Sequence, residues 1–195
     1  DIIDPQGTSF QASHLASTIA YRSEIEERVN EYIYRITKVK VKHKLVPSKQ
    51  ISIGTDKEIN IVNEGFGTNQ LVYLFSQIES SPSGSLVALE EPEIHLHPKA
   101  QAEMAEVLVD ISKQENKHLL ISTHSEHLLF RLLTNVASGK IDPKDLAVYY
   151  FELDKGFTKA TRLDVDEKGR LSGGLKGFFE TDLEEFGRFL GAQKP

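Results

Sequence analysis

The acidic end of one short apolar segment constrains the fold of this chain more than any other feature. Residues 86–89, Leu-Val-Ala-Leu, have the composition of a strand buried on both faces, and Glu90 and Glu91 follow them directly. Burying unpaired carboxylates is costly, so a cation or a retained proton is needed. A Mg²⁺ ion accepts one or two protein carboxylates, and the neighbouring glutamate could then act as a general base. The alternative is an ordinary solvated strand end.

A strand-helix-strand order surrounds this acidic segment. Pro98 suits the first turn of a helix that we expect to end near Lys113, and residues 118–122 form a second short apolar run. This order predicts a crossover unit of a parallel sheet, and such sheets bind ligands at the carboxyl ends of their strands. The first strand leads into Glu90, and the second leads into a Thr-His-Ser segment that contains His124. We therefore expect both segments at one edge of the sheet.

The rest of the chain predicts helices and β-hairpins around this core, without an internal repeat or a long linker. The fold class is therefore α/β, with a mainly parallel sheet, flanking helices and peripheral hairpins. We interpret residues 1–195 as one unit with three regions, 1–64, 65–135 and 136–195. The further expected elements are helices over 14–36, 69–79 and 182–190 and after Ser125, an alternating strand over 38–46, and hairpins over 51–61 and 146–163.

Composition favours a soluble cytoplasmic protein. The 195 residues, of which 39% are hydrophobic, suffice for the core of one domain. No apolar run reaches the ~20 residues of a membrane span, and the start does not resemble a signal peptide. The chain has no cysteine, so oxygen or imidazole groups would have to hold any metal ion. The net charge of −6 argues against general coating of nucleic acid, although residues 35–49 carry six basic side chains and no acid.

Three motifs together resemble those of a known ATPase family. LVALEEPEIHLHP, residues 86–98, resembles the Walker B strand and D-loop of ABC-type ATPases, in the Glu-Glu form of the OLD-like branch. ISTHSEHLL, residues 121–129, is similar to the H-loop, and GFGTNQLVYLF, residues 65–75, is similar to that branch's version of the signature motif. Their order and spacing make the resemblance specific, whereas the glycine-rich element alone would be weak. The resemblance covers most of the chain.

The resemblance implies ATP and Mg²⁺ as cofactors and assigns roles to particular residues. Glu90 would hold Mg²⁺, Glu91 would be the general base, and His124 would contact the γ-phosphate and the attacking water. The signature residues would bind the nucleotide of the opposing subunit in an ATP-dependent, head-to-tail homodimer; they are Gly65, Gly67, Thr68, Asn69 and Gln70. The D-loop residues would line the dimer interface; they are Glu93, His95, His97 and Pro98.

Two parts of the family pattern are altered or missing. Residues 67–70 are Gly-Thr-Asn-Gln instead of the usual Ser-Gly-Gly-Gln, so the γ-phosphate contact stays open between Thr68 and Asn69. The sequence contains no Gly-x-x-x-x-Gly-Lys-Ser/Thr phosphate loop. Because ABC-type ATPases carry that loop on an N-terminal lobe, we interpret the chain as the C-terminal lobe of a longer ATPase, inactive alone. The lobe with the phosphate loop (the Walker A lobe) would come from upstream sequence or from a second chain.

Two other hypotheses stay open at this stage. One is a docking module that does not hydrolyse ATP and binds a partner or nucleic acid through residues 35–49. The other is a freestanding metal-dependent hydrolase with ligands from Glu90, Glu91, Glu93, His95 and His97. Asp164 and Asp166 precede a predicted turn, so we exclude a nuclease centre there. The sequence does not choose among DNA repair, defence and other processes, and transport is disfavoured because no membrane domain is visible.

Overall fold

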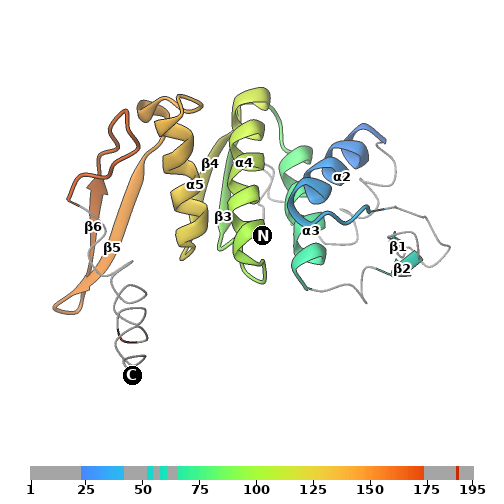
Figure 1. The fold of residues 1–195 in the computed structure, drawn as a ribbon, viewed down its shortest axis with the longest axis horizontal. Coiled ribbons are helices and arrows are strands. Elements are labelled where there is room, and N and C mark those ends of the chain that lie inside the picture. Colours follow the sequence, from blue (N-terminus) through green and yellow to red (C-terminus); the bar gives the residue numbers. More distant parts are fainter. Residues whose placement is uncertain (1–22, 42–51, 55–57, 61–65, 174–187, 189–195) are drawn as a thin grey trace, which may run out of the picture. The chain divides into compact units, whose positions relative to one another are not determined.

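The computed structural model describes residues 23–41, 52–54, 58–60, 66–173 and 188 (Figure 1). These residues fall into two compact units that divide between His124 and Ser125. The first unit contains α2 (Ser23–Thr37), β1 (Ser52–Gly54), β2 (Glu58–Asn60), α3 (Phe66–Ser80), β3 (Leu86–Glu90), α4 (Pro98–Glu115) and β4 (His118–Ser122). The second contains α5 (Glu126–Ala137), the 3₁₀ helix η2 (Pro143–Asp145), β5 (Val148–Asp154) and β6 (Phe157–Leu163).

The predicted crossover unit is present. Strands β3 and β4 pair in parallel, from Leu86 opposite His118 to Glu90 opposite Ser122, and α4 connects them. Pro98 occupies the first turn of α4, as expected. The helix ends at Asn116, whose left-handed backbone lets its N–H donate to the carbonyl of Ser112. This confirms the expected α/β class.

The sheet is buried on one face only, so the prediction that the first strand is buried on both faces is wrong. Val87 and Leu89 point into the core, whereas the exposed fraction of Leu86 is 68% and that of Leu120 on β4 is 62%. Side chains alternate between the two faces of a strand, so these residues mark a covered and an open face. Among the described residues β3 pairs only with β4, which leaves its other edge unpaired.

Helix α2 packs against both α3 and α4 and completes the core of the first unit (Figure 1). Val29 and Ile33 are fully buried on its inner face, and Tyr32 packs on Phe75 of α3 with ring centroids 5.3 Å apart. Arg35 binds Asp110 of α4 at 2.7 Å. The apolar residues of α2 are therefore buried on one face of the helix, as their helical spacing predicted.

A cluster of charged residues connects α2 and α3 with the end of α4. Arg28 binds the buried Glu79 of α3 at 2.7 Å, and Lys117 donates to Glu115 at 2.6 Å and to the carbonyl of Ile78 at 2.6 Å. Burial, followed by the neighbouring Glu115, raises the pKa of Glu79 to about 7. Burial also acts to raise the pKa of Glu115, but its hydrogen bonds with Glu79 and Lys117 outweigh burial and lower it.

Several other expected elements can be compared with the structure. The hairpin over 51–61 is present as β1 paired antiparallel with β2, and the hairpin over 146–163 is β5 paired with β6. The strand expected over 38–46 is wrong for residues 38–41, because Lys38 adopts φ 63° and its N–H caps α2 through the carbonyl of Tyr34. Residues 42–46, 14–22 and most of 182–190 lie outside the described residues.

The remaining features of the second unit are turns and caps. Ser125 caps α5 by accepting a hydrogen bond from the N–H of Leu128. Asp166 accepts from the N–H groups of Lys168 and Arg170, so it stabilises the predicted turn. No helix among the described residues is both long and apolar enough to cross a membrane.

Candidate functional site

Glu91 and His124 meet at the carboxyl edge of the parallel pair. The backbone N–H of Glu91 donates to the carbonyl of Ser122 at 2.9 Å and so extends the pairing one residue past β3. Glu91 has φ 41°, a left-handed conformation that is costly for a residue with a Cβ and that occurs often at functional sites. Its Oε1 lies 3.7 Å from Nε2 of His124. Both side chains remain accessible, with exposed fractions of 41% and 85%.

Glu90 lies beside this pair at the last position of β3 and is exposed. An exposed carboxylate next to Glu91 fits a Mg²⁺ ion, which needs one or two protein oxygens and takes its other ligands from water and phosphate. No three His, Asp or Glu side chains converge on one metal position within the described part of the chain.

Glu93 connects residues 92–98, named the D-loop for their resemblance to that element, with residues 121–129, named the H-loop for the same reason. It is buried, with an exposed fraction of 5%. Its Oε1 accepts hydrogen bonds from Oγ1 of Thr123 and, at 3.2 Å, from the backbone N–H of His124. The side chain therefore points into its own unit, whereas His95, His97 and Pro98 of the same loop are exposed. The Glu93–Thr123 contact was not predicted, because no local pattern links the two positions.

Helix α3 (the signature helix, because residues 65–75 resemble a signature motif) packs against the D-loop. Gly67 lies so close to this loop that an added Cβ would be 2.9 Å from the carbonyl oxygen of His95. Phe66 contacts the ring of His95 with centroids 5.6 Å apart, and Nε2 of Gln70 donates to the carbonyl of Pro92 at 3.4 Å. The D-loop is thus held between the signature helix and the H-loop. Gly65 lies outside the described residues.

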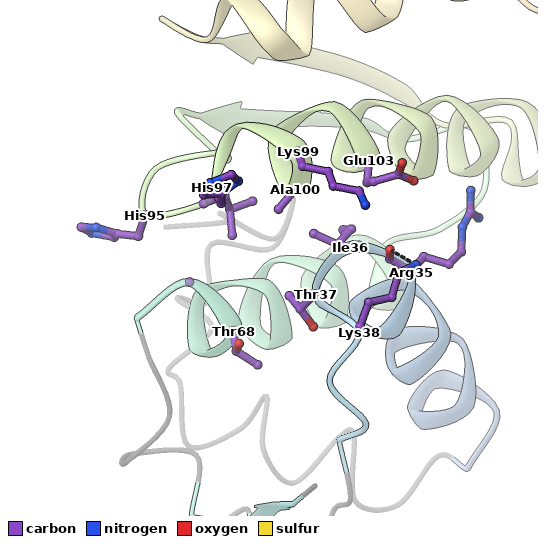
Figure 2. A pocket seen from close by; sticks show the side chains of 12 residues that line it. Arg35, Ile36, Thr37, Lys38, Thr68, His95, His97, Lys99, Ala100 and Glu103 are labelled. Carbon is purple, nitrogen blue, oxygen red and sulfur yellow. Dashed lines mark hydrogen bonds between the residues drawn. The ribbon is translucent and has the colours of Figure 1, made fainter.

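A cavity of about 420 Å³ opens where the signature helix, the D-loop and α2 meet (Figure 2). Thr68 of α3, Lys38 at the end of α2, and Lys99 and Glu103 of α4 contribute polar groups to its walls. The full lining is Arg35, Ile36, Thr37, Lys38, Gly67, Thr68, His95, Leu96, His97, Lys99, Ala100 and Glu103. Lys38 and Lys99 bring two basic groups to this lining and Glu103 one acid, whereas the guanidinium of Arg35 is paired with Asp110.

Part of the basic segment 35–49 is engaged within the chain. Arg35 is paired with Asp110, and Nζ of Lys38 donates to the carbonyl of Arg35 at 3.0 Å. Lys38 and Lys40 also lie over the ring of Tyr34, at 5.8 and 5.9 Å from its centroid. Residues 42–49 lie outside the described residues. The described basic groups thus already have intramolecular contacts.

Comparison with known families shows which family the chain belongs to. Residues 8–129, well over half of the chain, match the AAA ATPase domain family. The chain belongs to this family. Membership in the AAA ATPase domain family makes it a nucleotide-binding ATPase domain of the P-loop class. Residues 141–186 match a second family, described as a protein of unknown function, DUF3696.

Solved structures support the same fold. A structure described under ATP-driven dimerisation and DNA-stimulated activation of SMC ATPases is similar with a TM-score of 0.58 and 13% identity, covering 88% of this chain and 96% of that one. An SmcHead bound to the C-winged helix domain of ScpA gives a TM-score of 0.57 at 13% identity, covering 74% of this chain and 44% of that one. The fold thus resembles the head domains of SMC ATPases. The search of curated proteins finds no match.

Proposed function

We propose that this chain hydrolyses ATP as the C-terminal lobe of an OLD-like ABC ATPase. The observation that carries the proposal is the meeting of Glu91 and His124, 3.7 Å apart, at the carboxyl edge of a parallel pair. Parallel sheets bind ligands at this edge. A carboxylate placed there can accept a proton from water, and a neighbouring imidazole can contact a phosphate. Membership in the AAA ATPase domain family supplies the ATPase activity in general terms.

Each residue of this edge has a role in the proposed reaction. Bound MgATP supplies the phosphoryl group that is transferred to water. Glu90, exposed at the end of β3, would hold the Mg²⁺ ion of MgATP with its carboxylate. Glu91 accepts the proton of the attacking water, and the left-handed backbone at this residue turns its side chain toward His124. His124 donates a hydrogen bond to the γ-phosphate, for which its 85% exposure leaves room.

The proposed site requires a phosphate loop and a second subunit. The open face of β3 and β4 supports the first requirement, since parallel sheets are normally covered on both faces. The contact between the signature helix and the exposed part of the D-loop supports the requirement for a second subunit. Thr68, His95 and His97 line one cavity that a second molecule can reach. ATP-driven dimerisation is named for the similar SMC structure. We propose the same for this chain, with its signature residues completing the partner's site.

The test is Mg²⁺-dependent ATP hydrolysis by this chain together with the segment that carries its phosphate loop. Glu91→Gln removes the base but keeps the size of the side chain, so we expect turnover to fall about 10²- to 10⁴-fold with nucleotide binding retained. Glu167→Gln, in an exposed turn of the second unit, is the matched control and should keep full activity. Turnover by the isolated chain, or full activity of Glu91→Gln, would contradict the proposal.

A further inference from the structure

We propose that Glu93 is a positioning residue that fixes His124 opposite Glu91 and connects the D-loop to the H-loop. This inference rests on the proposed function, because it concerns the residue that would contact the γ-phosphate. Glu93 does not contact the reacting atoms in this arrangement. It acts through the backbone N–H of His124, to which its carboxylate is hydrogen-bonded. The side chain of His124, and not that of Glu93, lies opposite Glu91.

The two hydrogen bonds of Glu93 hold consecutive residues of the H-loop. Oε1 accepts from Oγ1 of Thr123 and from the N–H of His124 at 3.2 Å. These residues follow the last paired position of β4, so sheet pairing no longer holds their backbone. The side chain is buried, where a hydrogen bond to a carboxylate is stronger than at an exposed site. Removing Glu93 therefore takes away two hydrogen bonds from the segment that carries the imidazole.

The second carboxylate oxygen of Glu93 indicates that this side chain does more than stabilise the fold. Oε2 of Glu93 is buried and has no hydrogen-bond partner among the described residues. Such an oxygen carries a desolvation cost, and an apolar residue filling the same space would avoid it. A carboxylate retained at this cost is better explained by what Oε1 holds in place. The same oxygens explain why glutamine is the right conservative variant, since its carbonyl can accept both hydrogen bonds.

Glu93 also places the H-loop under the influence of the signature helix. The neighbouring residue Pro92 accepts from Gln70 of α3, and His95 lies against Gly67. A shift of the D-loop, such as contact with a second subunit would produce, is transmitted by Glu93 to His124. Coupling through packed, discrete contacts of this kind needs no long pathway. The proposed result is that dimer contact and γ-phosphate contact are linked through one carboxylate.

The test uses the active protein with its phosphate-loop segment and the variants Glu93→Ala, Glu93→Gln and Thr123→Val. Displacing a catalytic group by about 1 Å can cost about 10²-fold in rate, so we expect kcat of Glu93→Ala to fall about 10- to 100-fold. KM for ATP should stay within about twofold, because the residue does not bind the nucleotide. Glu93→Gln should keep kcat within about threefold, since both hydrogen bonds are preserved. Thr123→Val loses one hydrogen bond and should have an intermediate kcat.

A second readout separates this inference from the proposed function. Hydrogen exchange at the His124 amide, measured on the nucleotide-free protein, should accelerate in Glu93→Ala and stay slow in Glu93→Gln. Unchanged exchange in Glu93→Ala, or equal loss of kcat in the Ala and Gln variants, would overturn the positioning role. If Glu93→Ala fails to fold, full turnover by Thr123→Val would overturn it instead. A wild-type protein without Glu91-dependent turnover would remove the proposed function, while the exchange experiment would still test the contact.

Discussion

Gly67 has a packing role that the sequence did not predict. The resemblance implies that this glycine binds the nucleotide of an opposing subunit, and the structure also places it against the carbonyl of His95. An added Cβ would lie 2.9 Å from that oxygen and 3.0 Å from Cδ2 of Leu96. Alanine is the better helix former by about 1 kcal/mol, but crowding a packed contact costs about 1–3 kcal/mol. We expect Gly67→Ala to lower the free energy of unfolding by up to about 2 kcal/mol in urea denaturation.

Thr68→Ala is the comparison for this change, because it alters the next residue of the same helical turn without adding an atom near the D-loop. A Gly67→Ala protein that is more stable than the wild type would show that the D-loop moves away freely. In that case the contact between the signature helix and the D-loop would not be rigid. The stability of Gly67→Ala therefore tests the packing that the proposed coupling through Glu93 requires.

At the scale of elements, the buried Glu79 and its half-buried neighbour Glu115 make the packing of α2 on α3 depend on pH. The pKa of Glu79 is raised from 4.5 to about 7 by burial and by Glu115. Between these values the folded chain keeps a proton that the unfolded chain has lost, so stability from this group falls as pH rises. The lowered pKa of Glu115 has the opposite effect on stability. Its contribution is complete above pH 4.5 and is lost as the pH falls below that value.

We therefore expect the free energy of unfolding to decrease between pH 5 and pH 7. Glu79→Gln should flatten this decrease, because the amide cannot ionise, although it also changes the group that Arg28 contacts. Urea denaturation at several pH values measures both slopes. Glu27→Gln, at an exposed position of the same helix α2, is the control. Identical slopes for the wild type and Glu79→Gln would contradict the assignment of this titration to Glu79.

The elements differ in how far the sequence predicts them. The limits of β3, α4 and β4 follow from local signals, namely apolar runs, Pro98 at a helix start and helical spacing, and the prediction was close. The burial of β3 on one face, and the lack of a strand at residues 38–41, depend on which elements pack nearby. Likewise Glu91 and His124 were expected at one edge, but the contact of Glu93 with Thr123 depends on side-chain orientation in the folded loop.

At the scale of the whole molecule, the proposed function gives a role to the open face of the sheet. Leu86 and Leu120 expose 68% and 62% of their surface on a parallel pair, a kind of sheet that is normally covered on both faces. In the proposed function the lobe with the phosphate loop covers this face and brings the nucleotide to Glu90 and Glu91. The energy of that contact would come from burying these apolar side chains.

Leu120→Glu tests whether this face receives that lobe. Because Leu120 is already exposed, the substitution should change the melting temperature of the isolated chain little, whereas burying an unpaired carboxylate should weaken association with the phosphate-loop segment about tenfold or more. Leu153→Glu, at a leucine with 78% exposure on the β5–β6 hairpin, is the matched control and should associate normally. Association would be measured by calorimetry with the two segments as separate chains. Wild-type affinity in Leu120→Glu would place the phosphate-loop lobe elsewhere and leave the open face of β3 and β4 without a role in ATP hydrolysis.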